Sequence, residues 1–205
     1  MIVMKFDAGS ISSADRLRDV AQLVRRNLAR RPVVVTSALP KVTDLLLETA
    51  RRAEARDGEY EDCVEQIHAQ HVELATAVLH DAATRRRLLS KLEELFQELR
   101  TYYTAVASLE ELTPRTRDAI AAIGERLSAK LVLAALVQEG LRAQIVDARQ
   151  VVITDESFCG ASPIVEDTAA RARLHVKPLL DTGLVPVLGG YIGATRLGVT
   201  TTLGR

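Results

Sequence analysis

The sequence predicts an α/β fold with a mainly parallel sheet and a large helical insertion. Near the amino terminus, residues 2–36 have the pattern strand, loop, helix, strand, which is typical of parallel sheets with right-handed crossovers. Between residues 44 and 138, roughly half of the chain, apolar residues recur at helical spacing and no strand-like run occurs. We therefore expect one domain over residues 1–205, with a helical insertion at about 44–138.

The first structural unit is expected to begin with a buried strand over Ile2 to Phe6. Ser12 and Ser13 are suited to cap the helix that follows, because their hydroxyls accept from free backbone amides. That helix is expected to end near Arg31, since the next residue is a proline, which disfavours the helical conformation before it. Val33 to Thr36 then form a second buried strand.

The helical insertion contains three apolar stripes, with a break at Leu112-Thr113-Pro114 and a stop at Glu139-Gly140. Strands are expected again at residues 143–147, 151–154 and 184–188. A helix over about 164–180 lies between the second and third of these. A hairpin over residues 194–202 is expected to turn at Leu197-Gly198.

The composition excludes several classes of protein. Lysine plus arginine and aspartate plus glutamate both number 27, so net charge gives no attraction toward nucleic acid or anionic membrane. Aromatic residues make up 3% of the chain, too few for a base-stacking surface. We see no signal peptide and no apolar run of about 18 residues. Cys63 and Cys159 have no disulfide or zinc-ribbon spacing, which favours a reducing, cytoplasmic location.

Polar residues follow the first two predicted strands, where ligands collect in open parallel sheets. Lys5 closes the first strand, before Gly9 and a helix start, so it is a candidate for binding phosphate. The alternative is a solvated lysine that leaves the sheet. Ser37 and Thr43 follow the second strand and offer hydroxyls to a ligand. The alternative makes Ser37 a turn former and Thr43 a helix N-cap.

Two further candidates lie later in the chain. Glu125 follows Gly124, and a glycine inside a helix costs about 1 kcal/mol relative to alanine. That cost indicates a close approach or a helix start, whereas the alternative is an exposed pair with Arg126. Arg205 follows a threonine-rich strand and is suited to bind a carboxylate, although threonines are also simply good strand formers.

Other groups are weaker candidates. His68 and His71 lie three residues apart, but no third metal ligand is suitably spaced, so no metal site is expected. Arg85-Arg86-Arg87 is expected to be a solvated charge run. Cys159 lies in a predicted loop without a neighbouring base in the sequence, which disfavours a nucleophile.

Short segments in a fixed order carry a family resemblance. They are Lys5-Phe6, Ser10-Ile11, Ser37-Ala38, Val42 to Leu46, Gly124-Glu125 with Ser128, Gly190 to Gly193, and Thr200 to Arg205. This order resembles the first two thirds of the catalytic domain of aspartokinases, members of the amino acid kinase family. A Phe-Gly element of that family is represented by Phe158, with Cys159 before Gly160. The resemblance implies a three-layer α/β/α sandwich, here a partial amino acid kinase domain truncated at its C-terminal end.

The resemblance also implies roles for the candidates. Lys5 would stabilise the transferring phosphoryl group, and Ser37, Thr43, Glu125 and Arg205 would hold L-aspartate. The implied reaction is ATP-dependent phosphorylation of the aspartate β-carboxylate, with Mg²⁺ bridging the phosphates, as the first step toward lysine, threonine and methionine. The nucleotide-binding half of the family domain has no counterpart in the sequence, so low activity is expected.

One departure concerns the phosphate loop. The family has Gly-Gly-Thr where this chain has Asp7-Ala8-Gly9, followed by Ser10, so the loop is degenerate. A carboxylate about 5 Å from a phosphate oxygen, at an effective dielectric near 20, repels it by roughly 3 kcal/mol. This favours an alternative, a non-catalytic kinase homologue that binds a small amino acid or a protein partner. A third hypothesis makes residues 59–106 a helical docking surface. The oligomeric state stays open, and an exposed edge strand would favour a homo-oligomer.

Overall fold

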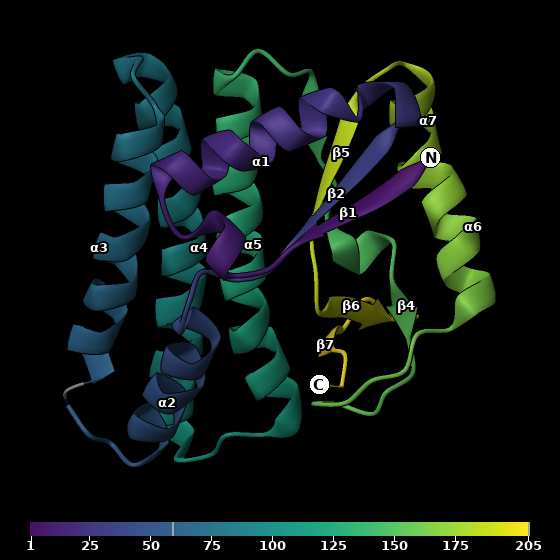
Figure 1. The fold of residues 1–205 in the computed structure, drawn as a ribbon. Coiled ribbons are helices and arrows are strands. Elements are labelled where there is room, and N and C mark those ends of the chain that lie inside the picture. The colour runs from purple at the N-terminus through teal and green to yellow at the C-terminus, as the bar shows by residue number, and fades with distance from the viewer. Residues whose placement is uncertain (59, 205) are drawn as a thin grey trace.

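Four parallel strands form the main sheet of the structure (Figure 1). Their order is β1 (Ile2–Phe6), β2 (Pro32–Thr36), β5 (Val185–Gly189) and β3 (Ala143–Ile145). The computed structural model describes residues 1–58 and 60–204. All three strand pairings are parallel, as the strand–helix–strand pattern at the amino terminus predicts.

Helices cover both faces of the main sheet, which gives the three layers of an α/β/α sandwich (Figure 1). Side chains alternate along the strands, so that Met4 and Val34 pack in the larger core with α1 (Ala14–Arg26) and α5 (Pro114–Gln138). Val33 and Leu188 point the other way. They pack in a second core with α6 (Val165–His175) and α7 (Lys177–Asp181).

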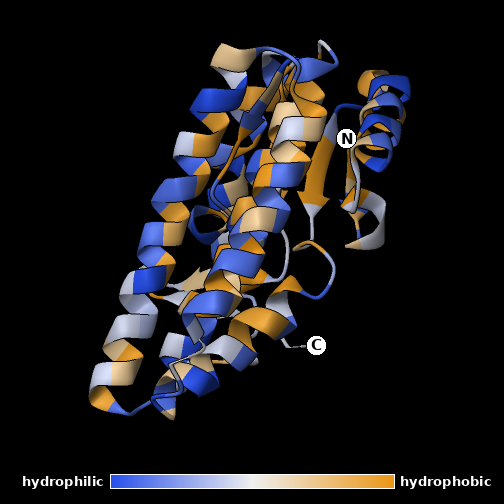
Figure 2. Ribbon diagram, turned by 90° about the vertical axis from the view of Figure 1, so that its left-hand side faces the viewer, coloured by the Kyte–Doolittle hydropathy of each residue, from blue (hydrophilic) through white to orange (hydrophobic). Residues whose placement is uncertain are grey.

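The helical segment consists of α2 (Val42–Glu54), α3 (Tyr60–Val78), α4 (Ala82–Leu109) and α5. Hydrophilic and hydrophobic residues alternate along these helices in Figure 2, as expected for helices that bury one face. The predicted stripes are buried, including Ile67 and Leu74 on α3 and Leu92 and Leu99 on α4. The expectation of helices across this stretch is therefore confirmed for its described residues.

A second, smaller sheet lies beyond the carboxyl end of β5. It contains β4 (Ile153–Thr154), β6 (Ile192–Thr195) and β7 (Thr200–Thr202) in the order β4-β6-β7. The β6–β7 pair is antiparallel and turns at Gly198, whose φ of 80° suits glycine. The predicted hairpin is thus confirmed.

Three boundaries predicted from the sequence are wrong. α1 ends at Arg26 rather than near Arg31, because Asn27 caps it by donating its side-chain amide to the Leu23 carbonyl, and only a 3-10 turn over Leu28–Arg30 continues to Arg31. Thr43 is not an N-cap, because the left-handed Lys41 ends the loop and α2 already begins at Val42.

The third wrong boundary is the single helix expected over 164–180, which is two helices, α6 and α7. Pro178 lacks the backbone N–H that would continue a regular helical ladder, and α7 restarts at Lys177.

Asp118 ties the small sheet to α5. Its side chain is 1% exposed, and its carboxylate accepts from the Thr202 hydroxyl at 2.6 Å and from the Cys159 backbone N–H at 2.9 Å. Cys159 has a φ of 65°, so the left-handed conformation that glycine favours lies at Cys159 rather than at Gly160. The buried Asp118 carboxylate therefore fixes both the end of β7 and the left-handed loop at Cys159 to α5.

We predict that Asp118→Ala lowers the free energy of unfolding by about 2–3 kcal/mol, because it leaves buried donors without an acceptor. Asp118→Asn keeps one acceptor oxygen and should lose less. Asp15→Ala is the matched control, since the Asp15 side chain is 83% exposed and its ion pair with Arg18 contributes little. Urea unfolding measures all three, and a loss for Asp118→Ala no larger than for the control would contradict the anchoring role.

Candidate functional site

The carboxyl ends of three neighbouring strands meet at one edge of the main sheet. Lys5 lies opposite Val35 in the β1–β2 register, and the next residue, Phe6, accepts a hydrogen bond from the Ser37 backbone N–H at 3.0 Å. On the other side of β2, Gly190 donates its backbone N–H to the Thr36 carbonyl at 2.7 Å. This edge is where the topology of an open parallel sheet places ligands.

Glycines bring α5 close to this edge. A Cβ on Gly124 would lie 3.2 Å from Ala38, Val42 and Leu46, so α2 packs directly against the α5 backbone. A Cβ on Gly189 would lie 3.1 Å from the Cβ of Glu125. Gly124 lies inside α5, so the close approach accounts for it and the helix start does not. Side chains at either position would push Glu125 away from the strand ends.

Glu125 is a buried carboxyl group at this edge, only 4% exposed. Burial raises its pKa to about 7, against the opposing effects of a hydrogen bond from the Ala38 backbone, the positive charge of Lys5 and a hydrogen bond from Gly190. Its Oε2 atom has no hydrogen-bond partner among the described residues. A buried carboxylate oxygen without a partner is costly, which points to a cationic ligand or donor at this position.

The loop after Lys5 is folded onto itself. The Asp7 carboxylate accepts from the Ser10 backbone N–H at 2.8 Å and from the Ser10 hydroxyl at 2.6 Å. These bonds, with the nearby Lys5 charge, lower the pKa of Asp7. Ala8 and Gly9 lie inside the turn that these bonds close, and the Ser12 hydroxyl donates to the Gly9 carbonyl at 2.9 Å.

The structure brings some of the other predicted site residues to this edge. Ser37 follows β2 directly and is half-buried. Thr43 lies in the first turn of α2, beside Val42, and is also half-buried. Arg205 lies outside the described residues.

A hollow of about 340 Å³ adjoins the site. Ala121, which lies one helical turn before Glu125 on α5, lines this hollow. Tyr191, which follows Gly190, also lines it. Asp118 and Thr202 form part of its wall. Sequence reasoning missed Asp118, although its spacing of seven residues from Glu125 places both on one face of α5 and could have indicated it.

The weaker candidates are not assembled into sites. His71 is fully buried, and burial lowers its pKa to about 4, whereas His68 pairs with Glu93 at 3.2 Å. No group of metal-ligating side chains is found within residues 1–58 and 60–204. Burial raises the pKa of the Cys159 thiol, which disfavours a thiolate nucleophile. No helix in the described part of the chain is long and apolar enough to cross a membrane.

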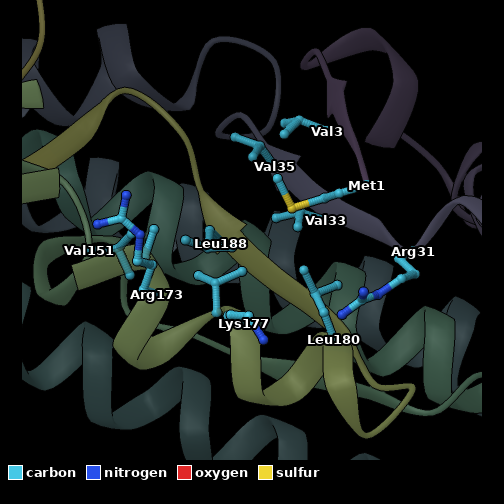
Figure 3. Close-up of a pocket in the computed structure, with 12 residues that line it drawn as sticks. Met1, Val3, Arg31, Val33, Val35, Val151, Arg173, Lys177, Leu180 and Leu188 are labelled. Carbon is cyan, nitrogen blue, oxygen red and sulfur yellow. The ribbon is translucent and has the colours of Figure 1, made fainter. Parts of the chain in front are cut away.

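A largely apolar cavity lies away from these residues. It occupies about 420 Å³ between the outer face of the main sheet and the helices α6 and α7. Figure 3 shows Val3, Val33, Val35 and Leu188 facing it, with Arg31 and Lys177 at its rim. Both of these cations pair with Asp181. None of the candidate site residues lines this cavity.

Comparisons with known proteins identify the family and the fold of this chain. The model of the amino acid kinase family matches residues 1–205. The chloroplastic aspartokinase 2 of Arabidopsis thaliana is 33% identical over 207 residues, which cover 99% of this chain and 37% of that protein. The aspartokinase of Chlamydia muridarum (strain MoPn / Nigg) is 29% identical over 204 residues, with 100% and 42% covered.

Solved structures of Escherichia coli aspartokinase III share the fold. One holds aspartate and ADP, and it matches with a TM-score of 0.90 at 28% identity, over 100% of this chain and 44% of that one. Another holds lysine and aspartate and matches equally well. This chain thus spans less than half the length of these relatives. The family model covers residues 1–205 and the fold is that of aspartokinase III, so the chain belongs to the amino acid kinase family and resembles the amino-terminal part of aspartokinases.

Proposed function

We propose that this chain binds L-aspartate between Lys5, Ser37 and Glu125, as the acceptor site of an aspartokinase-type phosphotransferase. The observation that carries the proposal is the buried Oε2 atom of Glu125, which has no partner among the described residues. An α-ammonium group would supply the missing donor and the missing positive charge. The E. coli relative, solved with aspartate, supports this choice of ligand.

The rest of the aspartate molecule would meet complementary groups. Lys5 is exposed at the strand end, and its ammonium is near enough to Glu125 to lower the glutamate pKa. It would place positive charge beside the β-carboxylate, where negative charge must be stabilised during phosphoryl transfer. Ser37 and Thr43 would donate hydroxyl hydrogen bonds, and Arg205 is proposed to bind a substrate carboxylate. The proposed reaction is ATP-dependent phosphorylation of the β-carboxylate.

The loop from Asp7 to Ser10 does not fit a triphosphate in the conformation observed, because the Asp7 carboxylate already accepts from Ser10. This observation favours the second candidate function, a non-catalytic homologue that binds the amino acid alone. Hydroxamate trapping of aspartyl phosphate, with ATP and Mg²⁺ supplied, separates the two when this sequence is extended past Arg205 by the remaining part of a relative's kinase domain. Product from the extended chain supports the kinase. Product only after Asp7 and Ala8 are both changed to Gly supports the homologue.

Location and assembly stay predictions. We expect a cytoplasmic location for this chain, whereas the relatives from Arabidopsis are chloroplastic. The prediction of a homo-oligomer rests on β1. This strand lies at an edge of the main sheet, where backbone groups are open to pairing with another chain.

The first prediction concerns protons released when aspartate binds. Glu125 must be ionised to pair with the ammonium, and its pKa of about 7 keeps it largely protonated below that pH. Aspartate affinity should therefore rise about tenfold per pH unit below pH 7 and level off above it. Calorimetry in buffers of different ionisation enthalpy should find about one proton released at pH 5.5 and almost none at pH 8. A pH-independent affinity would contradict the role of Glu125.

The second prediction concerns stability. The pKa of Glu125 is about 7 in the folded chain, against 4.5 for an unperturbed glutamate, so the folded chain holds the extra proton between these values. Stability from this group is fully present below pH 4.5 and is lost as pH rises toward 7, by up to about 3 kcal/mol. Glu125→Gln should lack this slope. It should therefore unfold at higher urea than the parent chain at pH 8, by a margin that shrinks at pH 5, while its aspartate affinity falls. Parallel pH slopes for the two proteins would rule out the ionisation of a buried Glu125.

The third prediction tests the coupling between Lys5 and Glu125. The Lys5 charge lowers the glutamate pKa, so Lys5→Met should raise it and move the rise in aspartate affinity to higher pH. Lys5→Arg keeps the charge and is the matched control, with its midpoint near that of the parent chain. A midpoint that does not move in Lys5→Met would show that the two side chains do not share a site.

A further inference from the structure

The cavity on the outer face of the main sheet takes no part in the proposed function. It occupies about 420 Å³ between the sheet and the helices α6 and α7. Its floor comes from alternate positions of the strands, with Val33 and Val35 on β2, Val3 opposite Val33 on β1, and Leu188 on β5. A hollow of this size, with mostly apolar walls and few polar groups, has the character of a small-molecule site.

The cavity opens on the side of β1. Met1 and Val3 line it and are 80% and 59% exposed, whereas Val176 and Leu180 on the opposite wall are buried. Apolar surface that water reaches is stabilised when an apolar group covers it. An occupant of this cavity therefore needs an apolar part.

The polar side chains that line the cavity, within the described part of the chain, are the cations Arg31, Arg173 and Lys177. Asp181 pairs with two of them, Arg31 and Lys177, at 2.5 Å each. Arg173 has no partner among the described residues, and Figure 3 shows it at the opposite end of the cavity from Arg31. The excess of positive charge favours an anionic group at the Arg173 end.

We propose that this cavity binds a medium-chain aliphatic carboxylate, a free fatty acid, with its alkyl chain over Val33 and Leu188 and its carboxylate at Arg173. A wholly polar anion would leave the apolar walls in contact with water, and a neutral hydrocarbon would gain nothing from Arg173. Aspartate binding is not required, since none of the residues proposed to hold aspartate lines the cavity.

The apolar part is tested with sodium hexanoate, octanoate and decanoate, each below its micelle concentration. The methyl resonances of Val33 and Leu188 are followed by NMR during titration of the full 205-residue chain. Affinity should rise about three- to fourfold for each added methylene, with shifts centred on these methyl groups. An affinity that does not depend on chain length, or shifts confined to other parts of the chain, would overturn the proposal.

The charged part is tested with Arg173→Gln, which should lower decanoate affinity about fivefold. Arg16→Gln is the matched control for net charge, because Arg16 is exposed on α1, which packs on the other face of the sheet. Decanol has the same chain without the charge and should bind the parent and Arg173→Gln chains equally. An equal loss in both arginine variants, or decanol binding as tightly as decanoate, would overturn the assignment of the carboxylate to Arg173.

A third variant fills the cavity. Ala172 lines it from α6 and is half-buried, so Ala172→Leu should occupy part of the space and weaken decanoate binding. Urea unfolding checks that this variant is folded, and an unchanged decanoate affinity in the folded variant would contradict the site.

Aspartate calorimetry on the parent chain separates this proposal from the proposed function. Decanoate binding without aspartate binding removes the proposed function alone. Aspartate binding without decanoate binding overturns the fatty-acid site alone.

Discussion

The close packing of α5 against the carboxyl ends of β2 and β5 is the constraint on which the site depends. Glu125 lies against the strand ends because Gly189 has no side chain, and a Cβ there would crowd the Cβ of Glu125. Gly124 similarly lets α2 pack directly onto α5. The result is a buried carboxyl group beside a lysine, with one oxygen that lacks a partner among the described residues. Such an arrangement destabilises the folded chain at neutral pH, and binding of a cation would relieve it.

The same helix, α5, also anchors the surrounding loops. Asp118 and Glu125 lie seven residues apart on α5, so one face of the helix carries both the buried Glu125 carboxyl group and the carboxylate that fixes β7 and the Cys159 loop. The two groups differ in their partners. Two hydrogen-bond donors meet the Asp118 carboxylate, whereas the buried Oε2 atom of Glu125 has no partner within the described residues.

The sequence predicts most of the fold because its signals are local. Apolar runs and helical stripes place β1, β2, β5 and the long helices, and Gly198 places the hairpin turn. The boundaries near Arg31, Thr43 and Pro178 could not be placed, since they depend on a side-chain cap, a left-handed lysine and a proline inside an apolar stretch. Lys5 and Glu125 could be named as candidates, but their proximity depends on tertiary packing. A single aspartate in a helix carries no local signal of its own, so Asp118 could be indicated only by its spacing of seven residues from Glu125. The bonds of Asp7 to Ser10 depend on the folded turn and could not be predicted.

The proposed function requires aspartate to lie at the edge formed by β1, β2 and β5, with its ammonium against Glu125. A crystal structure of the chain grown with L-aspartate tests this most directly. We expect the α-amino nitrogen within hydrogen-bond distance of Glu125 Oε2, and the β-carboxylate toward Lys5. Well-ordered aspartate elsewhere on the molecule, or an empty strand edge with Glu125 Oε2 still without a partner, would contradict it.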